Sequence, residues 1–537
     1  MAFCEQCGAE LSAGVRFCEE CGSPVDYDES SSSVLFGDDD SPSQFHLNLF
    51  NASDWKVRWE EAAESVGDCE LGLIITRENA LISQLEGAGA DRFHKELCEY
   101  IAKAEDRGIK YYYCDFDACA FHDGDGTVES VVASLRKIVE VARPKYLFIL
   151  GNEDVIDVAR WENQTGDGDE TVESDLCYST LDVCTPWDGQ QYNFDEVMRV
   201  GRLPSHDGET LYSYCRYFES AKRYIGTIDV VRSYGLSALV WEEESNDEYK
   251  EISRDKVDVS PEVTNDDVHS RICDDTNLLF FNLHGSDDTE FWYGQEDSSY
   301  PEAFSPTILE NRERPYFLGV EACYGARYLD GLSDEESIMM TALRNNCLAF
   351  LGSSKIAFGT SRPKGSCADI VVGDYVKYLA KGFSAGDAYV EGLRRLDSDS
   401  DDMDDSDIKT LAEFALYGDP SATMGCNKRK CGNKGLFKST RIAKGLPVPM
   451  PDVRRCVQMA LAEVDAKIEA IVDDFVVRNL MPELRDLGLG AAKQSIFKMK
   501  NTGLNQKIYS LGSGTIRKVA KVYFDDNGRI RKALTSK

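Results

Sequence analysis

The sequence predicts an α/β fold built as two subdomains, and three observations lead to this prediction. Short apolar runs alternate with segments of helical spacing over residues 46–425. Runs such as LLFFNL and YFLGV are apolar throughout, which is typical of strands buried on both faces of a parallel sheet. The alternation breaks near residues 225–230, so we expect one α/β subdomain at 46–225 and a second at 226–425. A chain of 537 residues is also too long for a single core.

The apolar runs predict eight strands in this region. They are Leu71–Thr76, Tyr111–Phe116, Tyr146–Gly151, Met198–Leu203, Leu236–Trp241, Asn277–Leu283, Tyr316–Glu321 and Cys347–Gly352. Helical spacing between the runs predicts helices at Val128–Ala142, Asp207–Tyr224 and Ile338–Arg344. Strands that alternate with helices favour parallel pairing through helical crossovers.

The segments on either side of this region differ from it in composition. Residues 26–45 are rich in Ser and Asp and predict a flexible linker. Residues 426–445 form a basic linker, and residues 446–537, here called the tail, predict a basic α+β domain. In the tail we expect a helix at Val453–Leu480 and a β-hairpin around Asp526-Asn527-Gly528. The acidic run Asp397–Ile408 could bind calcium, but its spacing is not that of an EF-hand, so we expect a solvated loop.

Charge is distributed unevenly along the chain. Residues 421–537 carry 23 basic and 10 acidic side chains, whereas residues 1–420 carry 36 basic and 85 acidic ones. A body this acidic repels nucleic acids and anionic membranes, and it attracts basic peptides. The nearest basic peptide is the chain's own tail, although acidic residues also serve solubility.

The sequence also predicts a cytoplasmic location. The N-terminus, MAFCEQCGAEL, has neither the basic nor the apolar region of a signal peptide, and no apolar stretch is long enough to span a membrane. In a reducing compartment the 18 cysteines are expected to be free thiols, metal ligands or a catalytic group.

Four cysteines at the N-terminus predict a structural zinc site. They form two CxxC pairs, and each pair is followed by a glycine that tolerates a tight turn. The expected ligands of the single zinc ion are Cys4, Cys7, Cys18 and Cys21. The segment, residues 1–25, resembles the small zinc ribbons at the N-termini of many prokaryotic proteins. Four protein ligands leave no open position, so we expect this module to bind a protein partner or to position the protein rather than to do chemistry.

A cysteine and a histidine predict a nucleophilic active site. One apolar strand runs into His284-Gly285, and a later one ends in Glu321-Ala322-Cys323. A thiolate is the reactive form of cysteine, so a nearby imidazole is needed to take or return the proton. Parallel strands that are neighbours would bring both side chains to the same edge of the sheet. The backbone N–H groups of Gly285 and Cys323 are the candidate oxyanion donors.

This arrangement, strand-His-Gly and then strand-Ala-Cys about forty residues later, resembles the caspase–gingipain clan of cysteine peptidases. Further phrases resemble the gingipain branch over residues 70–425. They are HGSDDTEFWYG, VMRVGRLP, LAFLGSSKIAFGTS and the closing GDPS. The resemblance implies two stacked α/β subdomains of caspase–gingipain type, with Cys323 as nucleophile and His284 as base in the second. The zinc ribbon and the basic tail depart from the secreted gingipains, so secretion does not carry over.

The resemblance also implies that acidic residues follow the strand before the histidine strand. In the segment SALVWEEESNDEYK, Glu242 or Glu243 would orient His284. Asp247, with Glu248 as its rival, would bind a basic side chain at the P1 position of the substrate. The alternative interpretation is that each of these residues lies in a solvated acidic loop.

We therefore predict a cysteine endopeptidase that cleaves proteins after Arg or Lys. The basic stretch 427–441 is expected to act as an autocleavage segment or a latch near the acidic site. Two alternatives stay open. One is a catalytically silent scaffold that binds partners through the zinc ribbon, and the other is a zinc-ribbon protein whose basic tail binds RNA, which the acidic body argues against.

Overall fold

The structure is a computed structural model of the chain, and it falls into two compact units, Met1–His46 and Leu47–Lys537. It describes residues 2–3, 10–11, 55–84, 90–119, 125–189, 192–204, 212–328, 337–360, 365–399, 403–425, 460–461, 464, 466–499, 502–513 and 516–537. In the first unit, β1 (Ala2–Phe3) and β2 (Glu10–Leu11) pair antiparallel. The four N-terminal cysteines and the expected linkers at 26–45 and 426–445 lie outside the described residues.

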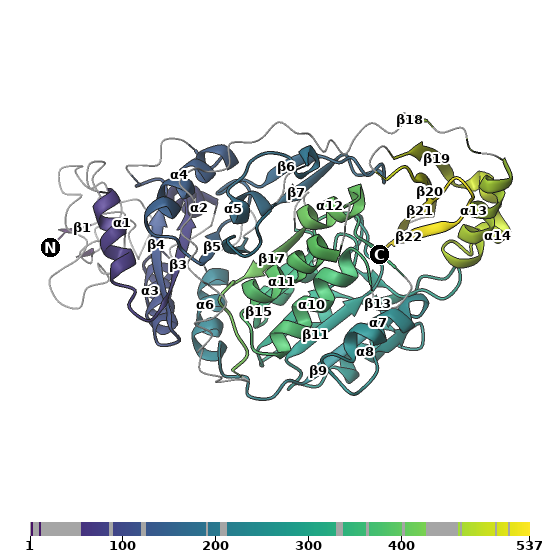
Figure 1. The fold of residues 1–537 in the computed structure, drawn as a ribbon. Helices are drawn as coiled ribbons and strands as arrows, with labels where there is room; N and C mark the ends of the chain where they lie inside the picture. Colours follow the sequence, from purple (N-terminus) through teal and green to yellow (C-terminus); the bar gives the residue numbers. More distant parts are fainter. Residues whose placement is uncertain are drawn as a thin grey trace. The chain divides into compact units, whose positions relative to one another are not determined.

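One ten-stranded sheet runs through both halves of the α/β region (Figure 1). Its order is β10-β9-β11-β14-β15-β17-β8-β5-β3-β4, and every neighbouring pair is parallel except β15 and β17. The strands are β3 (Glu70–Thr76), β4 (Ile109–Asp115), β5 (Tyr146–Leu150), β8 (Arg199–Leu203), β9 (Ser233–Ala238), β10 (Asp258–Ser260), β11 (Leu278–Asn282), β14 (Tyr316–Val320), β15 (Cys347–Ser353) and β17 (Phe414–Gly418). The fold is therefore mixed α/β, as predicted.

All eight expected strands are present within three residues of their predicted bounds. The sequence analysis missed β10, which is short, and β17, which begins directly after a helix. β17 matters because it joins the two halves: it pairs with β15 of the second half and with β8 of the first. Asp419, one residue beyond β17, accepts hydrogen bonds from Tyr100 (2.6 Å) and Tyr111 (2.8 Å) of the first half.

Helices cover the sheet, and α10 and α11 pack on each other against its central strands (Figure 1). Their bounds are α1 (Trp55–Glu64), α2 (Glu78–Gln84), α3 (Ala90–Glu105), α4 (Val128–Val141), α5 (Leu176–Thr180), α6 (Tyr212–Tyr224), α7 (Glu242–Tyr249), α8 (Asn265–Arg271), α9 (Ile338–Arg344), α10 (Ala368–Ala380), α11 (Ala385–Asp399) and α12 (Asp405–Glu413). The expected helices at 128–142 and 338–344 are confirmed, and α6 confirms 212–224 of the third. Among the helices that the structure describes, none has the length and apolarity that a membrane crossing needs.

Short elements complete the region. They are the strands β6 (Ala159–Glu162), β7 (Thr171–Ser174), β12 (Trp292–Tyr293), β13 (Glu302–Phe304) and β16 (Phe358–Gly359), and the 3-10 helices η4 (Pro186–Asp188), η5 (Leu239–Trp241) and η6 (Pro306–Ile308). β6 pairs with β7 and β12 with β13, in both cases antiparallel.

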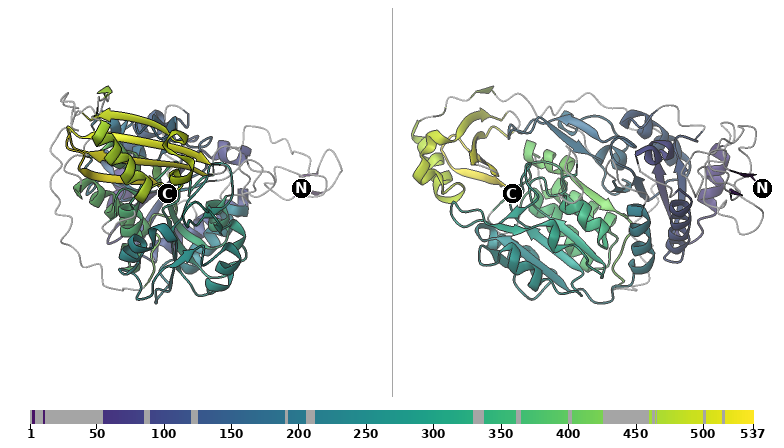
Figure 2. Two further views of the ribbon diagram at one scale, coloured as in Figure 1. Left: turned by 90° about the vertical axis from the view of Figure 1, so that its right-hand side faces the viewer. Right: turned by 180° about the vertical axis from the view of Figure 1, so that it is seen from behind.

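The tail folds as an antiparallel sheet with helices against it (Figure 2). Its elements are β18 (Ala460–Leu461), α13 (Ala466–Asn479), α14 (Leu484–Leu487), η7 (Leu489–Ala491), β19 (Lys493–Lys498), β20 (Asn505–Ser513), β21 (Ile516–Phe524) and β22 (Ile530–Ser536). β21 and β22 form the hairpin expected around Asp526-Asn527-Gly528. The helix expected at Val453–Leu480 is shorter among the described residues, because residues 460–461 pair with β19 instead.

The sheet order of the tail is β16-β22-β21-β20-β19-β18. β16 belongs to the α/β region, so the tail sheet continues across the boundary between the two parts of the chain. The apolar core of the tail lies between α13 and the sheet, and it includes Val472, Val476, Tyr509 and Phe524.

The acidic run differs from the expected solvated loop. Asp404 caps α12, and its carboxylate accepts the backbone N–H groups of Ser406 (2.8 Å) and Asp407 (3.1 Å). Asp404, Asp405 and Asp407 are all buried, because the tail covers them. Lys532 of β22 donates to Asp404 (2.6 Å) and to Asp407 (2.8 Å), so a lysine ammonium faces two of these carboxylates.

Candidate active site

His284 and Cys323 follow two neighbouring strands of the large sheet. β11 and β14 pair in parallel, with Phe281 opposite Val320, so both strands end at the same edge. His284 lies two residues after β11 and Cys323 lies three residues after β14. The two loops are in close contact: a Cβ atom placed on Gly285 would lie 1.7 Å from the carbonyl oxygen of Cys323. Only glycine fits at this position.

The Cys323 thiol is almost completely enclosed. Its residue is 2% exposed, and Sγ lies 3.6 Å from the carbonyl oxygen of Ala357, to which it donates. Burial raises the pKa of the thiol above its ordinary value. Tyr324, the next residue, has a φ of 53°, a left-handed conformation that is costly for a bulky side chain. Its hydroxyl donates to Asp169 (2.5 Å), which holds this strained turn in place.

The imidazole of His284 is fully buried and held from several sides. Its Nε2 lies 2.7 Å from Oε1 of Gln295, an amide that in turn donates to the carbonyl of Asp297 (2.8 Å). Since an amide oxygen only accepts, Nε2 carries the proton and Nδ1 is left as the basic nitrogen. The rings of Trp241 and Tyr300 lie 4.4 and 5.2 Å from the imidazole, measured between centroids. Burial and then the charge of Lys518 lower the pKa of His284 to about 3, against the opposing effect of Gln295.

The side chain that orients the histidine is therefore Gln295, and the structure does not bring Glu242 or Glu243 against the ring. Both glutamates lie at the start of α7. Glu242 is paired with Lys256 (3.4 Å) and is 40% exposed, and Glu243 is exposed. The expected strand Leu236–Trp241 would have ended directly before them. In the structure β9 ends at Ala238, η5 follows, and the first turn of α7 leaves these two side chains facing solvent.

Beside the dyad lies a pocket of buried carboxylates. Glu244 from α7, Glu321 at the end of β14 and Asp369 from α10 are each 0% exposed, and one oxygen from each lies within 4.8 Å of the others. The carboxylate of Glu248 lies against Gly373 of α10, next to this group. Burial raises the pKa of Glu321 to about 8, and burial also raises those of Glu244 and Glu248. Acids packed this closely stay ionised together only beside a cation.

The cation is the ammonium group of Lys537. Its Nζ lies 2.8 Å from Asp369, 3.4 Å from Glu321 and 3.9 Å from Glu244, and 4.3 Å from the centre of the Trp241 ring. Burial alone would lower the pKa of Lys537, but Asp369, Glu321 and Glu244 outweigh it and raise the pKa. The pocket therefore holds a lysine side chain by charge and by cation–π contact.

Asp247, the residue expected to line such a pocket, lies elsewhere. Its side chain is 32% exposed and forms an ion pair with Lys250. Its rival Glu248 is the member of the pair that reaches the pocket, because it lies one helical turn after Glu244 on α7.

The backbone of Lys537 also contacts the dyad loop. The N–H of Lys537 donates to the carbonyl of Ala357 (2.9 Å), and the N–H of Cys323 donates to the carbonyl of Lys537 (3.2 Å). One of the two expected oxyanion donors, Cys323, thus already binds a carbonyl oxygen beside the thiol. The Gly285 loop lies next to it, against the Cys323 backbone.

The chain that carries this site is similar to a known protein family. Residues 73–425 match the family described as peptidase family C25. The chain belongs to peptidase family C25. It is therefore a cysteine peptidase, as the sequence analysis predicted, and its substrates are proteins. Residues 3–25 of this C25 peptidase match a zinc-ribbon domain, which covers all four N-terminal cysteines.

No curated protein matches the C25 peptidase. A solved structure titled "Structure of Protease" aligns with a TM-score of 0.43 at 12% identity, covering 87% of this chain and 91% of the other.

Four residues of the C25 peptidase site escaped the sequence analysis for different reasons. Glu244 carried a signal, because its spacing of four from Glu248 indicates one face of a helix. Glu321 lies two residues before Cys323, and only its place at a strand end marks it in the sequence. Asp369 lies 46 positions after Cys323 and belongs to no motif, so only the fold of α10 reveals it. Gln295 likewise has no signal in the sequence, because it contacts His284 only where the loop after β12 folds back onto it.

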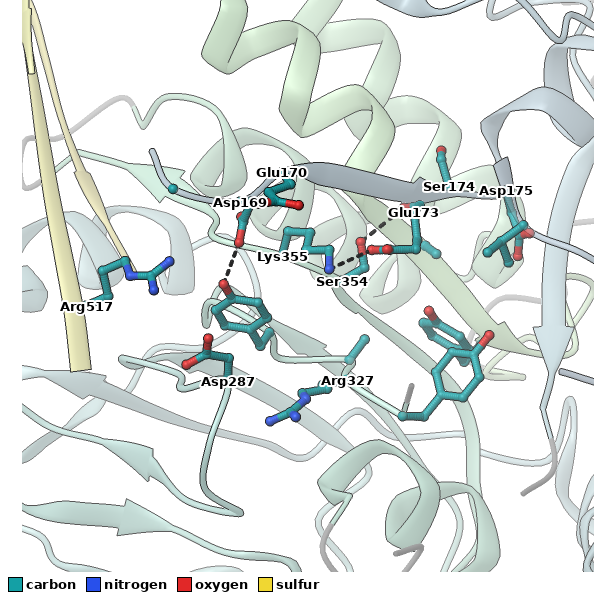
Figure 3. A pocket seen from close by; sticks show the side chains of 17 residues that line it. Asp169, Glu170, Glu173, Ser174, Asp175, Asp287, Arg327, Ser354, Lys355 and Arg517 are labelled. Atoms are coloured by element: carbon teal, nitrogen blue, oxygen red, sulfur yellow. Dashed lines mark hydrogen bonds and ion pairs between the residues drawn. The ribbon is translucent and has the colours of Figure 1, made fainter. Parts of the chain in front are cut away.

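A second cavity of the C25 peptidase adjoins the nucleophile loop (Figure 3). It measures about 370 Å³, and Tyr324 and Asp287 reach it from the loops that carry Cys323 and His284. Side chains of both charges line it: Asp169, Glu170, Glu173, Asp287, Arg327, Lys355 and Arg517. Lys355 is paired with Glu173 (3.0 Å), and Asp169 accepts from Tyr324. The cavity is therefore polar, and it adjoins the loops that carry Cys323 and His284 without being lined by either residue.

Proposed function

We propose that this C25 peptidase is an endopeptidase that cleaves proteins after a basic residue, with Cys323 as nucleophile and His284 as acid–base catalyst. The observation that carries the specificity is the Lys537 ammonium group bound between Asp369 and Glu321. A pocket that neutralises one buried ammonium group accepts the side chain of a lysine at P1. The guanidinium group of arginine is larger than the ammonium group that these carboxylates surround, so lysine is the preferred residue at P1.

The proposed reaction is acyl transfer. The Cys323 thiolate attacks the carbonyl carbon of the P1 residue, and the oxyanion is bound by the N–H groups of Cys323 and Gly285. Nδ1 of His284 takes the thiol proton and returns it to the leaving amine, so the peptide bond breaks and a thioester forms. Water, deprotonated by the same nitrogen, then hydrolyses the thioester and restores the thiol. Gln295 keeps the imidazole in the required tautomer by accepting from Nε2.

We assign the four N-terminal cysteines, Cys4, Cys7, Cys18 and Cys21, as the ligands of one zinc ion. Four thiolates suit zinc, and the match to a zinc-ribbon domain supports the assignment. The ion would hold the ribbon fold together and leave this module free to bind a protein partner.

We infer a cytoplasmic location from the state of the cysteines. Eleven cysteines of the described residues are free thiols, and several of them are buried. Free thiols persist in a reducing compartment.

We infer that the buried lysines of the tail serve contacts with protein groups rather than with nucleic acid. Lys518, Lys521 and Lys537 are buried against protein groups, Lys507 is paired with Glu469 and Asp473, and Lys532 is paired with two aspartates. This arrangement also supports the expectation that the acidic body binds the chain's own basic residues.

The proposed function is tested with fluorogenic peptides that differ only at P1, as Lys, Arg or Asp. The full-length chain is compared with Cys323→Ala and His284→Ala after a limited protease cut or mild urea has exposed the site. We expect cleavage of the Lys peptide, weaker cleavage of the Arg peptide, and no cleavage by either variant. Full activity of either variant would contradict the dyad assignment. A preference for the peptide with Asp at P1 would contradict the pocket assignment alone.

A further inference from the structure

We propose that the tail is a built-in inhibitor of this peptidase, and that its strand β22 occupies the substrate cleft in the direction of a substrate. The inference rests on the function proposed above, since it names the regulation of the same site. The occupant is residues Leu534–Lys537, which run along β16 and end with the Lys537 side chain in the carboxylate pocket.

The backbone register is that of a peptide bound for cleavage. β22 pairs antiparallel with β16, with Thr535 opposite Gly359 and Ser536 opposite Phe358. The next residue, Lys537, donates its N–H to Ala357 and places its carbonyl on the Cys323 N–H. A peptide that adds a strand to an exposed sheet edge gains affinity from these main-chain hydrogen bonds and specificity from the alternate side chains. Lys537 thus lies where a P1 residue would, and Leu534 lies where P4 would.

The strand is anchored by a folded domain and does not lie in the cleft alone. One apolar cluster joins Cys323, Ile356, Phe358 and Cys367 of the body with Ile508, Val519, Tyr523 and Leu534 of the tail. Leu534 is 0% exposed in this cluster. The tail is therefore packed against the nucleophile itself.

Ion pairs fix the tail to the body at a second place. Lys532 binds Asp404 and Asp407 at the start of α12, and Lys521 lies 3.1 Å from the hydroxyl of Ser406 between them. These contacts use the opposite charges of the two parts of the chain. They lie outside the carboxylate pocket and outside the dyad, so they can be altered without touching either.

The tail shields the site from solvent. Cys323 is 2% exposed and His284 is 0% exposed, so neither side chain is presented to a second peptide while β22 is in place. The enclosed surroundings also favour the neutral thiol and the neutral imidazole, which keeps the nucleophile in its unreactive form. Departure of β22 would admit both water and substrate.

The connection between body and tail supplies a way to release this inhibitor. Residues 427–441 contain Lys428, Arg429, Lys430 and further basic residues, which have the side-chain chemistry that the pocket binds. While this segment is intact, the tail rebinds as part of the same molecule at a high effective concentration. A cut by another copy of the enzyme turns rebinding into a bimolecular event, and dilution then favours the open site.

The experiment measures the reactivity of Cys323 directly. Full-length protein is treated with iodoacetamide, and the alkylation rate of each cysteine is followed by peptide mass spectrometry. Lys532→Glu removes the ion pairs with α12, and Lys537→Ala removes the pocket contact. Lys498→Glu is the matched control, because Lys498 is a partly exposed tail lysine that pairs with Asp526 within the tail. Cys347, buried in β15, reports whether the body stays folded.

We expect both Lys532→Glu and Lys537→Ala to raise the alkylation rate of Cys323 by about tenfold or more and to raise cleavage of an acetyl-Leu-Thr-Ser-Lys reporter in parallel. Lys498→Glu should behave as the unaltered chain, and Cys347 should stay unreactive in all. Rapid alkylation of Cys323 in the unaltered chain, or equal rates in all variants, overturns the inhibitor. Exposed Cys323 without Lys-peptide cleavage would instead overturn the proposed function and leave the inhibitor standing.

Discussion

The ammonium group of Lys537 lies 2.8 Å from Oδ1 of Asp369, and solvent reaches neither side chain. The other oxygen of Asp369 accepts the backbone N–H groups of Thr360 and Ser366, both at 2.8 Å. One carboxylate oxygen is thus fixed by the loop before α10, and the other is presented to the cation. Asp369 is therefore the carboxylate best placed to bind the P1 side chain of a substrate.

Asp369→Asn tests that role in an enzyme whose site has been opened. To keep both backbone hydrogen bonds, the amide oxygen must replace Oδ2, which turns the NH₂ group toward the substrate ammonium. Hydrogen bonds to charged groups contribute about 1.5–3 kcal/mol, so kcat/KM for a Lys peptide should fall by about 10- to 100-fold. The fall should be mostly in substrate affinity, measured as KM against kcat.

Asp247→Asn is the matched control, because Asp247 is a partly exposed aspartate on the neighbouring helix α7 that pairs with Lys250. It should leave kcat/KM unchanged. If Asp247→Asn lowers Lys-peptide cleavage and Asp369→Asn does not, the pocket has been assigned to the wrong carboxylate.

Gly285→Ala should inactivate the enzyme while the chain stays folded. The added Cβ would meet the Cys323 carbonyl oxygen at 1.7 Å, and because that atom belongs to the backbone, the two catalytic loops must move apart. A displacement of about 1 Å can cost about 100-fold in rate, which is the expected loss in kcat/KM. Gly490→Ala is the control, since a Cβ atom added there would have no neighbour within 4 Å, and full activity of Gly285→Ala would refute the close approach.

That His284 and Cys323 lie at one edge of the sheet was predictable from sequence, because each follows an apolar run of the kind that forms a buried strand. Once β11 and β14 are parallel neighbours, His284 and Cys323 must meet at one edge. The pocket was not predictable in the same way. Its members come from α7, β14 and α10, and Asp369 becomes a pocket residue only because α10 packs against β14.

The attraction between body and tail was predictable from the sequence, but the pairing of their strands was not. The opposite charges of the two regions indicate attraction, and the ion pairs of Lys532 with Asp404 and Asp407 agree with it. The sequence offered no sign that β22 would pair with β16, because β16 is two residues long and its partner strand lies about 170 positions away. The acidic run predicts a solvated loop, because nothing in the local sequence indicates that Lys532 covers Asp404 and Asp407.

Lys409→Met should destabilise the body strongly. Lys409 is fully buried, and its Nζ lies 2.6 Å from Asp167 and 2.7 Å from Asp169, which are themselves buried. Removing one partner of a buried ion pair leaves an uncompensated charge and costs about 3–5 kcal/mol of unfolding free energy. Urea unfolding measures this loss, and adding Asp167→Asn should recover part of it because one unpaired charge disappears.

Lys103→Met is the control for that substitution, because Lys103 pairs with Asp106 at the surface, where both are more than half exposed. It should change the free energy of unfolding by no more than about 0.5 kcal/mol. Equal losses for the two variants would mean that the Lys409 cluster contributes no more than a surface pair.

His284 should make the stability of the covered enzyme depend on pH. Its pKa in the folded chain is about 3, because it is buried and lies near Lys518, whereas an unfolded histidine has a pKa of about 6.5. Below about pH 6.5 the unfolded chain therefore binds a proton that the folded chain does not, so the free energy of unfolding falls as the pH falls toward 3.

The variant His284→Gln tests this, because glutamine cannot bind the proton and the variant lacks that part of the loss in free energy of unfolding. Between pH 7.5 and pH 5.0 the unaltered chain should lose about 2 kcal/mol more than His284→Gln in urea unfolding, since each pH unit below 6.5 is worth about 1.4 kcal/mol. The buried carboxylates beside the dyad are present in both proteins, so they cancel in this difference, and equal losses would show that His284 is not held in its neutral form.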